Sequence, residues 1–296
     1  MSACTIISDS TCDFSAFQAK ASRVEIVPFH SSDTTGSFTG DDDLFQSVSP
    51  RDFYRLIMSG RVLHTSQPSQ LEFADAFRRV LEGDGEAVVF CISSGLSGGY
   101  NGAVLARNLL SEENPDAERR IHIVDSLLAS TPMHILVDEA CRRRDQGWSA
   151  EQIASWALDA RYELQTLFMV DGLEALHRGG RVPKTVAVAG DKLNVKPLLT
   201  FNLEGKLALC GATRGRKKGL AKLEANFEKK HADGEAPLVV GIGDADAVAE
   251  ADALADRLRA HYPELRVLRS TIGPTIGCHV GAGMISCCFW GADRRG

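Results

Sequence analysis

The sequence lacks the features that mark a membrane, secreted or metal-binding protein. The 296-residue chain has no run of about 18 apolar residues, so no segment is predicted to span a membrane. Its first basic residue is Lys20, and we expect no secretory signal because such signals begin with positive charge. The 8 cysteines form no C-x-x-C pair, and several lie within apolar runs. We therefore expect reduced, buried thiols, a cytoplasmic location and no metal site.

An excess of positive charge is also absent. Lys and Arg number 33 against 39 Asp and Glu, which gives a net charge of −6. Because phosphate binding favours a basic face, we expect no nucleic acid partner. With 44% hydrophobic and 24% charged residues, the composition is that of an ordered globular protein. The length suits one large domain or two ordinary ones.

The first half of the chain alternates short apolar runs with amphipathic stretches. This alternation is typical of a parallel sheet with helices on its faces, so we predict an α/β fold. The polar residues 30–43 are predicted to be a solvated loop rather than a cation site. The predicted strands cover residues 4–7, 24–27, 87–92 and 121–124, and the predicted helices cover residues 14–21, 70–81, 103–110, 132–146 and 150–164.

The second half mixes a hairpin with strand–helix units, which predicts a mixed sheet. Residues 202–206 (NLEGK) form the hairpin turn, because glycine supplies the positive φ that such a turn needs. We place the domain boundary near residue 160, with a parallel-sheet domain at 1–160 and a mixed α/β domain at 161–296. The predicted strands here are 166–170, 197–201, 207–211, 238–242 and 267–270, and the predicted helices are 216–230 and 247–260.

Hydroxyl-bearing residues follow three of the predicted strands, at 8–11, 93–99 and 125–126. In an open parallel sheet, the carboxyl ends of the strands line the ligand crevice. The free N–H groups of the following helices favour an anion there. Helix capping is the alternative interpretation of each hydroxyl, because Ser, Thr and Asp are the usual capping residues.

Two further segments could complete such a crevice. In residues 65–69 (TSQPS), Ser69 and Glu72 match a capping box, which leaves Thr65 and Ser66 free to face a ligand. Residues 273–283 contain four glycines around His279, a composition that suits a backbone folded closely around a ligand. A structural histidine is the alternative interpretation.

Two basic segments are candidates for contact with an acidic partner or a phosphate group. Arg178 and Arg181 flank a Gly-Gly turn, and residues 214–218 place four cations at the predicted start of a helix. Because the helix macrodipole disfavours cations there, we do not expect them to serve helix stability. A solvated surface is the alternative.

An enzyme remains possible from these residues. Ser94 or Ser93 with His279 would suggest a serine hydrolase, and His279 alone a phosphotransfer subunit. The serines lie in I-S-S-G-L-S-G, however, and not in a G-x-S-x-G elbow, and the segment lacks the G-K-[ST] ending of a P-loop. No acid is placed by the sequence to orient the histidine. The residues alone indicate an anion-binding crevice, and a sugar phosphate would also suit it.

Taken together and in their order along the chain, these segments resemble the DegV family, the fatty-acid-binding (FakB-type) proteins. The chain departs from the family pattern at Gly99, Cys278 and Ala282, where the family usually has Thr, Thr and Pro. None of these differences removes a hydroxyl or imidazole group assigned to the ligand. The shared motifs are Ser8-Asp9-Ser10-Thr11, Thr65-Ser66-Gln67-Pro68-Ser69, Ser93-Ser94-Gly95-Leu96-Ser97-Gly98, Val124-Asp125-Ser126 with Ala129-Ser130, Gly179-Gly180-Arg181, Lys196-Pro197, Arg214 to Lys218, and Gly273-Pro274 through His279 to Gly283.

The resemblance implies two α/β domains with a long-chain fatty acid buried between them. The carboxylate would meet Thr65 and Ser93 or Ser94, with His279 close by. Such a protein has no catalytic residues or cofactor of its own and presents the carboxylate to a separate ATP-dependent fatty acid kinase. The kinase forms an acyl phosphate for phospholipid synthesis in the bacterial cytoplasm, with at most transient membrane contact. The docking face for the kinase and its phosphate would consist of Arg181, Arg214, Arg216 and Lys217.

Overall fold

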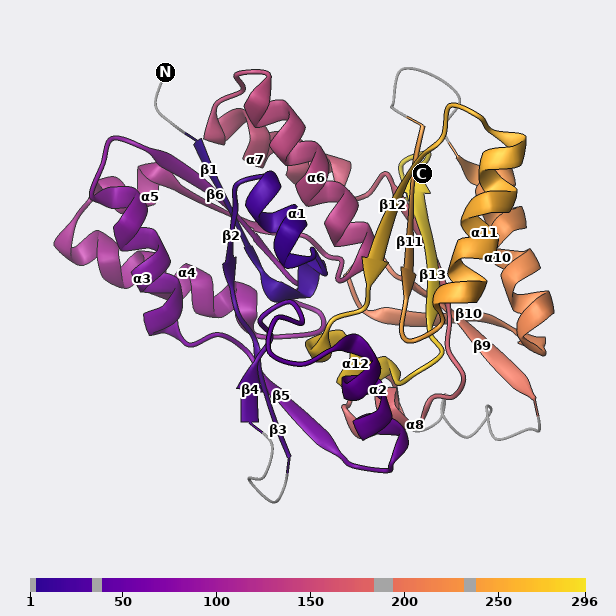
Figure 1. The fold of residues 1–296 in the computed structure, drawn as a ribbon. Coiled ribbons are helices and arrows are strands. Elements are labelled where there is room, and N and C mark those ends of the chain that lie inside the picture. The colour runs from indigo at the N-terminus through magenta and orange to yellow at the C-terminus, as the bar shows by residue number, and fades with distance from the viewer. Residues whose placement is uncertain (1–3, 34–38, 184–193, 232–237) are drawn as a thin grey trace.

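The structure, a computed structural model, describes residues 4–33, 39–183, 194–231 and 238–296. In Figure 1 the N-terminal strands and helices, in indigo and magenta, lie on one side, and the C-terminal ones, in orange and yellow, lie on the other. Each side is built around one large sheet, and a third, small sheet lies at the bottom of the view. Among the helices of these residues, none is long and apolar enough to cross a membrane.

The N-terminal sheet consists of four parallel strands in the order β2-β1-β6-β7, as predicted. Side chains alternate between its faces: Ile6 and Val88 face the core under α6 and α7, whereas Ile7 and Val89 face α3 and α4. Both faces are therefore covered, as a parallel sheet requires. The elements are β1 (Cys4–Asp9), η1 (Ser10–Cys12), α1 (Ala16–Ala21), β2 (Val24–Val27), α3 (Gln70–Leu81), β6 (Glu86–Cys91), α4 (Gly99–Glu113), α5 (Asp116–Arg120), β7 (Ile121–Asp125), α6 (Thr131–Asp145) and α7 (Ala150–Ala160).

The C-terminal sheet has six strands in the order β10-β9-β8-β13-β11-β12, and only β11 and β12 pair in parallel. The predicted mixed sheet is thus confirmed. Its inner strand β13 has no counterpart in the sequence prediction, because its residues ISCCFW follow a glycine-rich segment and lack an alternating pattern. The elements are β8 (Leu164–Met169), α8 (Glu174–Arg178), β9 (Val195–Phe201), β10 (Leu207–Arg214), α10 (Arg216–Lys230), β11 (Val239–Asp244), α11 (Val248–His261), β12 (Arg266–Thr271), α12 (Pro274–Val280) and β13 (Ile285–Trp290).

The polar segment 30–43 is not the solvated loop that its composition predicts. Most of its described residues form two strands of the small antiparallel sheet, in the order β4-β3-β5. Residues 34–38 of the segment lie outside the described residues. Polar side chains do not prevent strand formation here, because the backbone groups are paired across the sheet. The elements are β3 (His30–Asp33), β4 (Thr39–Asp41), β5 (Leu63–Ser66) and, between β4 and β5 in the chain, α2 (Pro50–Met58).

α6 lies between the two large sheets and joins them (Figure 1). Its residues 131–137 are all buried, and it packs against β1 on one side and against β11 and β13 on the other. Gly241 on β11 allows this close approach, because a Cβ there would lie 2.9 Å from Cδ1 of Ile135. The domain boundary near residue 160 stays a prediction, and the strands of the two large sheets fall on either side of it.

Two buried carboxylates hold the start of α12. Asp13 accepts a hydrogen bond from the backbone N–H of Gly273 at 2.9 Å and another from the hydroxyl of Ser130. Asp42 accepts hydrogen bonds from the backbone N–H and the hydroxyl of Thr275, at 3.1 and 2.6 Å. Burial raises the pKa of both carboxyls, that of Asp42 to about 6. These bonds attach α12 to residues that directly follow η1 and β4 and lie far away in the sequence.

The raised pKa of Asp42 predicts a pH-dependent cost of folding. Between pH 4 and about 6 the unfolded chain releases this proton before the folded chain does, so the free energy of unfolding falls as the pH rises. Asp42→Asn removes this dependence and keeps an acceptor for Thr275. The free energy of unfolding of the variant, minus that of the native chain, should therefore be larger at pH 7.5 than at pH 4.5. Urea unfolding at the two pH values measures this difference.

Asp84→Asn, at an exposed turn after α3, is the matched control and should leave the pH dependence unchanged. An Asp42→Asn variant that differs from the native chain by the same amount at both pH values would contradict the argument.

Candidate functional site

A cavity lies where α12 meets residues from both large sheets. It contains about 650 Å³ of space not filled by atoms, part of which is open to solvent. Three aromatic rings contribute to its wall: Phe29 follows β2, and Phe168 and Phe201 belong to β8 and β9. Such a wall suits an apolar ligand. The apolar lining residues are Phe29, Ile92, Leu96, Ala129, Pro132, Phe168, Leu176, Phe201, Leu207, Ile276, Val280 and Met284.

Thr65, Arg181 and His279 form a polar cluster in this wall. A hydrogen bond of 2.9 Å joins Oγ1 of Thr65 to Nε2 of His279. Arg181 donates from Nε to the carbonyl oxygen of Leu96 at 3.1 Å, and from Nη1 to the carbonyl oxygen of Gly179. A guanidinium group has five N–H donors, so about three remain unspent among the described residues. The cluster can therefore donate several hydrogen bonds to an anion.

His279 is neutral at physiological pH. Burial, followed by the positive charges of Arg181 and Arg178, lowers the pKa of His279 to about 4. Among the described residues, no carboxylate forms a hydrogen bond with its ring. Gly179 packs against the ring so closely that a Cβ there would lie 2.2 Å from Nδ1. A neutral imidazole has one N–H, which Nε2 can donate to Oγ1 of Thr65 so that the Thr65 hydroxyl is free to donate to a ligand. The nearby positive charges favour a negatively charged ligand here.

Ser93 and Ser94, which the resemblance implies as carboxylate contacts, do not line the cavity. Ser93 is fully buried and donates to the carbonyl oxygen of Gly205 at 2.8 Å. Ser94 is exposed and donates to a carboxylate oxygen of Asp125 at 2.5 Å. Ser97, from the same segment, lines the cavity in their place. The bond between Ser93 and Gly205 joins the strand end after β6 to the hairpin turn between β9 and β10.

The structure separates the four residues expected to form one docking face. Arg181 lines the cavity, whereas Arg214 and Lys217 are exposed at the end of β10 and the start of α10. Two exposed cations therefore remain as candidates for contact with a partner.

Arg216 forms ion pairs within the chain. Its Nη1 lies 2.6 Å from Oδ1 of Asp171, and its Nε lies 2.8 Å from Oε2 of Glu250. Nη1 also donates to the carbonyl oxygen of Gly283 at 2.8 Å. Two carboxylates thus compensate this cation, which ties the start of α10 to α11. Arg216 is therefore engaged within the chain, and its contact with a partner stays a prediction.

The predicted alternative of a Ser94–His279 catalytic pair also fails on geometry. The Ser94 hydroxyl donates to Asp125, and the His279 ring bonds to Thr65. A nucleophile must lie within hydrogen-bond reach of its base, and these two residues share no hydrogen bond. Nδ1 of His279 faces Gly179 and Nε2 is taken by Thr65, so neither nitrogen is placed for phosphotransfer.

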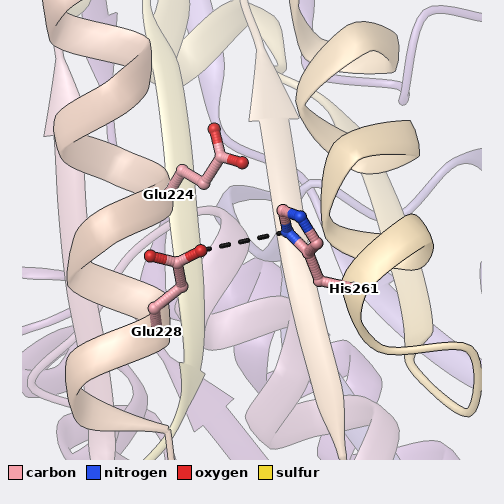
Figure 2. A group of neighbouring side chains, drawn as sticks. All are labelled: Glu224, Glu228 and His261. Atoms are coloured by element: carbon pink, nitrogen blue, oxygen red, sulfur yellow. Dashed lines mark ion pairs between the residues drawn. The ribbon is translucent and has the colours of Figure 1, made fainter.

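A group of metal-ligating side chains lies outside the cavity. Figure 2 shows Glu224 and Glu228 on α10 facing His261 at the end of α11. Their donor atoms lie within 4.8 Å of one another, and no other group of this kind occurs in the described parts of the chain. Glu228 pairs with His261 at 3.9 Å, and Glu224 pairs with Arg257 at 2.8 Å. These ion pairs give the group a role in attaching the two helices to each other.

Sequence reasoning identified Thr65 and His279 as cavity residues but missed the rest of the wall. Phe168 and Phe201 read as ordinary buried strand residues, because periodicity does not distinguish a core from a cavity wall. The prediction places Arg181 on a partner surface, whereas the structure places it in the cavity wall. The two glycines before it are a sequence signal of close packing. Ser97 belongs to the same motif as Ser93 and Ser94, but the prediction names only those two serines as ligand contacts.

The chain is similar to a known family and to several solved structures. Residues 3–291 match the family described as "Uncharacterised protein, DegV family". A DegV domain-containing protein of Clostridium perfringens is 34% identical over 254 residues, which is 86% of each chain. The structure of a stearic acid-binding protein from Eubacterium ventriosum has a TM-score of 0.82 and 27% identity, and the match covers 97% of both chains. The fatty acid kinase B3 protein of Streptococcus pneumoniae, solved with linoleic acid, has a TM-score of 0.83 at 22% identity, over 99% of this chain and 100% of that one.

The fold and the cavity define an α/β protein with two large sheets and a mainly apolar site that is partly open to solvent. The match over nearly the whole chain adds the family: the protein belongs to the DegV family. The predicted resemblance is thereby confirmed.

The positive environment of His279 can be tested by nuclear magnetic resonance. In the native chain we expect its imidazole to titrate near pH 4 rather than at the usual 6.5. Arg181→Gln removes one of the charges that lower this pKa, so the titration should move upward, though burial will keep it below 6.5. Long-range proton–nitrogen spectra recorded from about pH 3 to 8 would follow the ring. Arg214→Gln, an exposed matched control, should leave the His279 titration in place, and an equal shift in both variants would contradict the assignment.

Proposed function

We propose that this protein binds a long-chain fatty acid in the cavity and presents its carboxylate to a separate ATP-dependent kinase. The observation that carries the proposal is the single cavity wall that combines aromatic and aliphatic side chains with the donors of Thr65, Arg181 and His279. The fatty acids named for the structural relatives support it. The product would be an acyl phosphate for phospholipid synthesis, and the protein would act in the cytoplasm.

The binding energy of such a ligand comes mainly from its tail. Each buried CH₂ group contributes about 0.8 kcal/mol, so a sixteen-carbon chain would gain roughly 12 kcal/mol before the costs of association. The head group then needs to be oriented rather than held tightly. The N–H of neutral His279 can donate to Oγ1 of Thr65, which leaves the Thr65 hydroxyl free to donate to the carboxylate, and Arg181 adds a positive charge.

The polar cluster contains no group for phosphoryl transfer. A kinase reaction needs bound nucleotide, metal ions and a phosphate-binding loop. The described residues of the cavity wall supply hydroxyls, one imidazole and one guanidinium, all of which are donors. The transferred phosphoryl group would therefore come from the partner, and this protein would be the lipid-binding subunit of the kinase system.

Arg214 and Lys217 support the proposed partner contact. Both are exposed and lie close together in the sequence, and no ion pair among the described residues neutralises their charge. The chain as a whole has a net charge of −6, so a local positive surface favours an acidic or phosphorylated protein over nucleic acid.

The lipid can be tested directly. The purified protein should release about one long-chain fatty acid on organic extraction, identified by mass spectrometry. After delipidation, stearic acid should raise the melting temperature by about 5 °C or more, because a ligand that binds only the folded state stabilises it. Octanoic acid, which has the same head group and a shorter tail, is the control and should give a much smaller rise. No released lipid together with no melting shift would overturn the proposal.

The partner surface can be tested separately from lipid binding. Arg214→Glu with Lys217→Glu should abolish acyl phosphate formation by a cognate kinase and ATP, because the reversed charges repel the docking partner. Lipid content should stay at the native level, since neither residue lines the cavity. Lys222→Glu on α10 is the matched control and should retain native turnover. If the double variant also supports native turnover, these residues are ordinary solvated surface.

A further inference from the structure

The cavity wall carries more hydroxyl groups than a plain hydrocarbon chain requires. Outside the polar cluster, six Ser or Thr side chains line it. Two of them are spent inside the protein, because Ser130 donates to Asp13 and Thr275 donates to Asp42. The six residues are Ser97, Ser130, Thr131, Thr166, Thr275 and Ser286.

Thr131 and Ser286 form a pair that leaves one hydrogen without an acceptor. Their Oγ atoms lie 2.8 Å apart, and Ser286 Oγ also accepts the backbone N–H of Gly243 at 3.1 Å. The pair has two hydroxyl hydrogens and uses one of them in the bond between the two residues. When Ser286 donates to Thr131, the hydroxyl hydrogen of Thr131 has no acceptor among the described residues. When Thr131 donates instead, the hydroxyl hydrogen of Ser286 has only the weakly accepting thiol of Cys288. Both side chains are buried, where an unpaired donor is costly.

Thr166 carries a second unspent hydroxyl. The residue is buried, and apart from the thiol of Cys288 its Oγ1 has no hydrogen-bond partner among the described residues. Across the β8–β13 ladder it faces Cys288, whose thiol is a weak partner at best. Ser286 lies two residues from Cys288 on the same face of β13. Diagonal neighbours of this kind are about 7–8 Å apart, so the unspent groups lie close together in one cavity wall.

We propose that Thr131, Thr166 and Ser286 form a second polar subsite for an acyl chain that carries an oxygen substituent, that is, a hydroxy fatty acid. This inference rests on the proposed function. A hydroxyl on the ligand both accepts and donates, so it can take the free hydrogen of the Thr131–Ser286 pair and donate to Oγ1 of Thr166. A plain chain would leave these groups unpaired, whereas an oxygen at the matching depth satisfies them.

The position of the oxygen along the chain provides the test. Delipidated protein is loaded with a fluorescent polyene fatty acid, which is then displaced by stearic acid or by a series of hydroxystearic acids that differ only in hydroxyl position. All the isomers share the cost of removing one hydroxyl from water, so a difference between positions reports the subsite. We expect one or two adjacent isomers to bind about tenfold more tightly than stearic acid.

Variants that remove a hydroxyl at nearly constant shape should erase this preference. In Thr131→Val and Thr166→Val, the favoured isomer should bind no better than the others, while stearic acid binds as well as before or more tightly. Thr166→Ser keeps the hydroxyl and should keep the preference. Thr200→Val on β9 is the matched control, because that hydroxyl donates to the backbone oxygen of Thr166 at 2.7 Å and does not line the cavity.

The outcomes separate this inference from the proposed function. Failure of every fatty acid to displace the probe would overturn the proposed function and, with it, the subsite. Displacement by stearic acid with a flat or weaker response to all the hydroxy isomers would overturn only the subsite, and the unspent hydroxyls would then hold water. A preference that survives both Val variants would also overturn it. If the Val variants do not fold, the positional profile of the native protein decides the question alone.

Discussion

The geometry of the cavity depends on two carboxylates buried at the start of α12. Taking Asp13 and Asp42 out of water is unfavourable, as their raised pKa values show, and the hydrogen bonds from Gly273, Ser130 and Thr275 offset that cost only in part. In return these bonds fix a short helix whose own length could not stabilise it. That helix carries His279, and so the placement of the donor group depends on two residues that never touch the cavity.

Most helices and strands that have one or two apolar faces could be predicted from the sequence. The helix limits at Gln70–Leu81 and Arg216–Lys230 agree with the structure, and a capping box at Ser69 explains the first of them. β3 and β4 were not predicted because their stability comes from pairing, β3 with both β4 and β5, a property that polar residues do not reveal. β13 was missed because its position inside the sheet is set by strands distant in the sequence.

The candidate site could be predicted only in part. Thr65 and His279 lie 214 residues apart in the sequence and form one hydrogen bond, whereas the family resemblance implied only that both lie near the ligand carboxylate. Motifs indicate which segments gather at the site, but not which of two adjacent side chains points inward. The motif therefore suggested Ser93 and Ser94 as ligand contacts, but these residues donate hydrogen bonds to Gly205 and Asp125. Ser97 of the same motif lines the cavity. Arg216 shows a related difficulty, since its carboxylate partners come from other elements.

The burial of α6 on all sides has a consequence for how such a chain can change over evolutionary time. A helix with a solvent face tolerates substitutions there, but residues 131–137 of α6 have none. Ile135 packs so close to Gly241 that a larger residue at either position would displace the other. We therefore expect the residues of α6 to covary with those of both large sheets in natural relatives. The two halves of the chain would then be inherited together and would not be exchanged as separate modules.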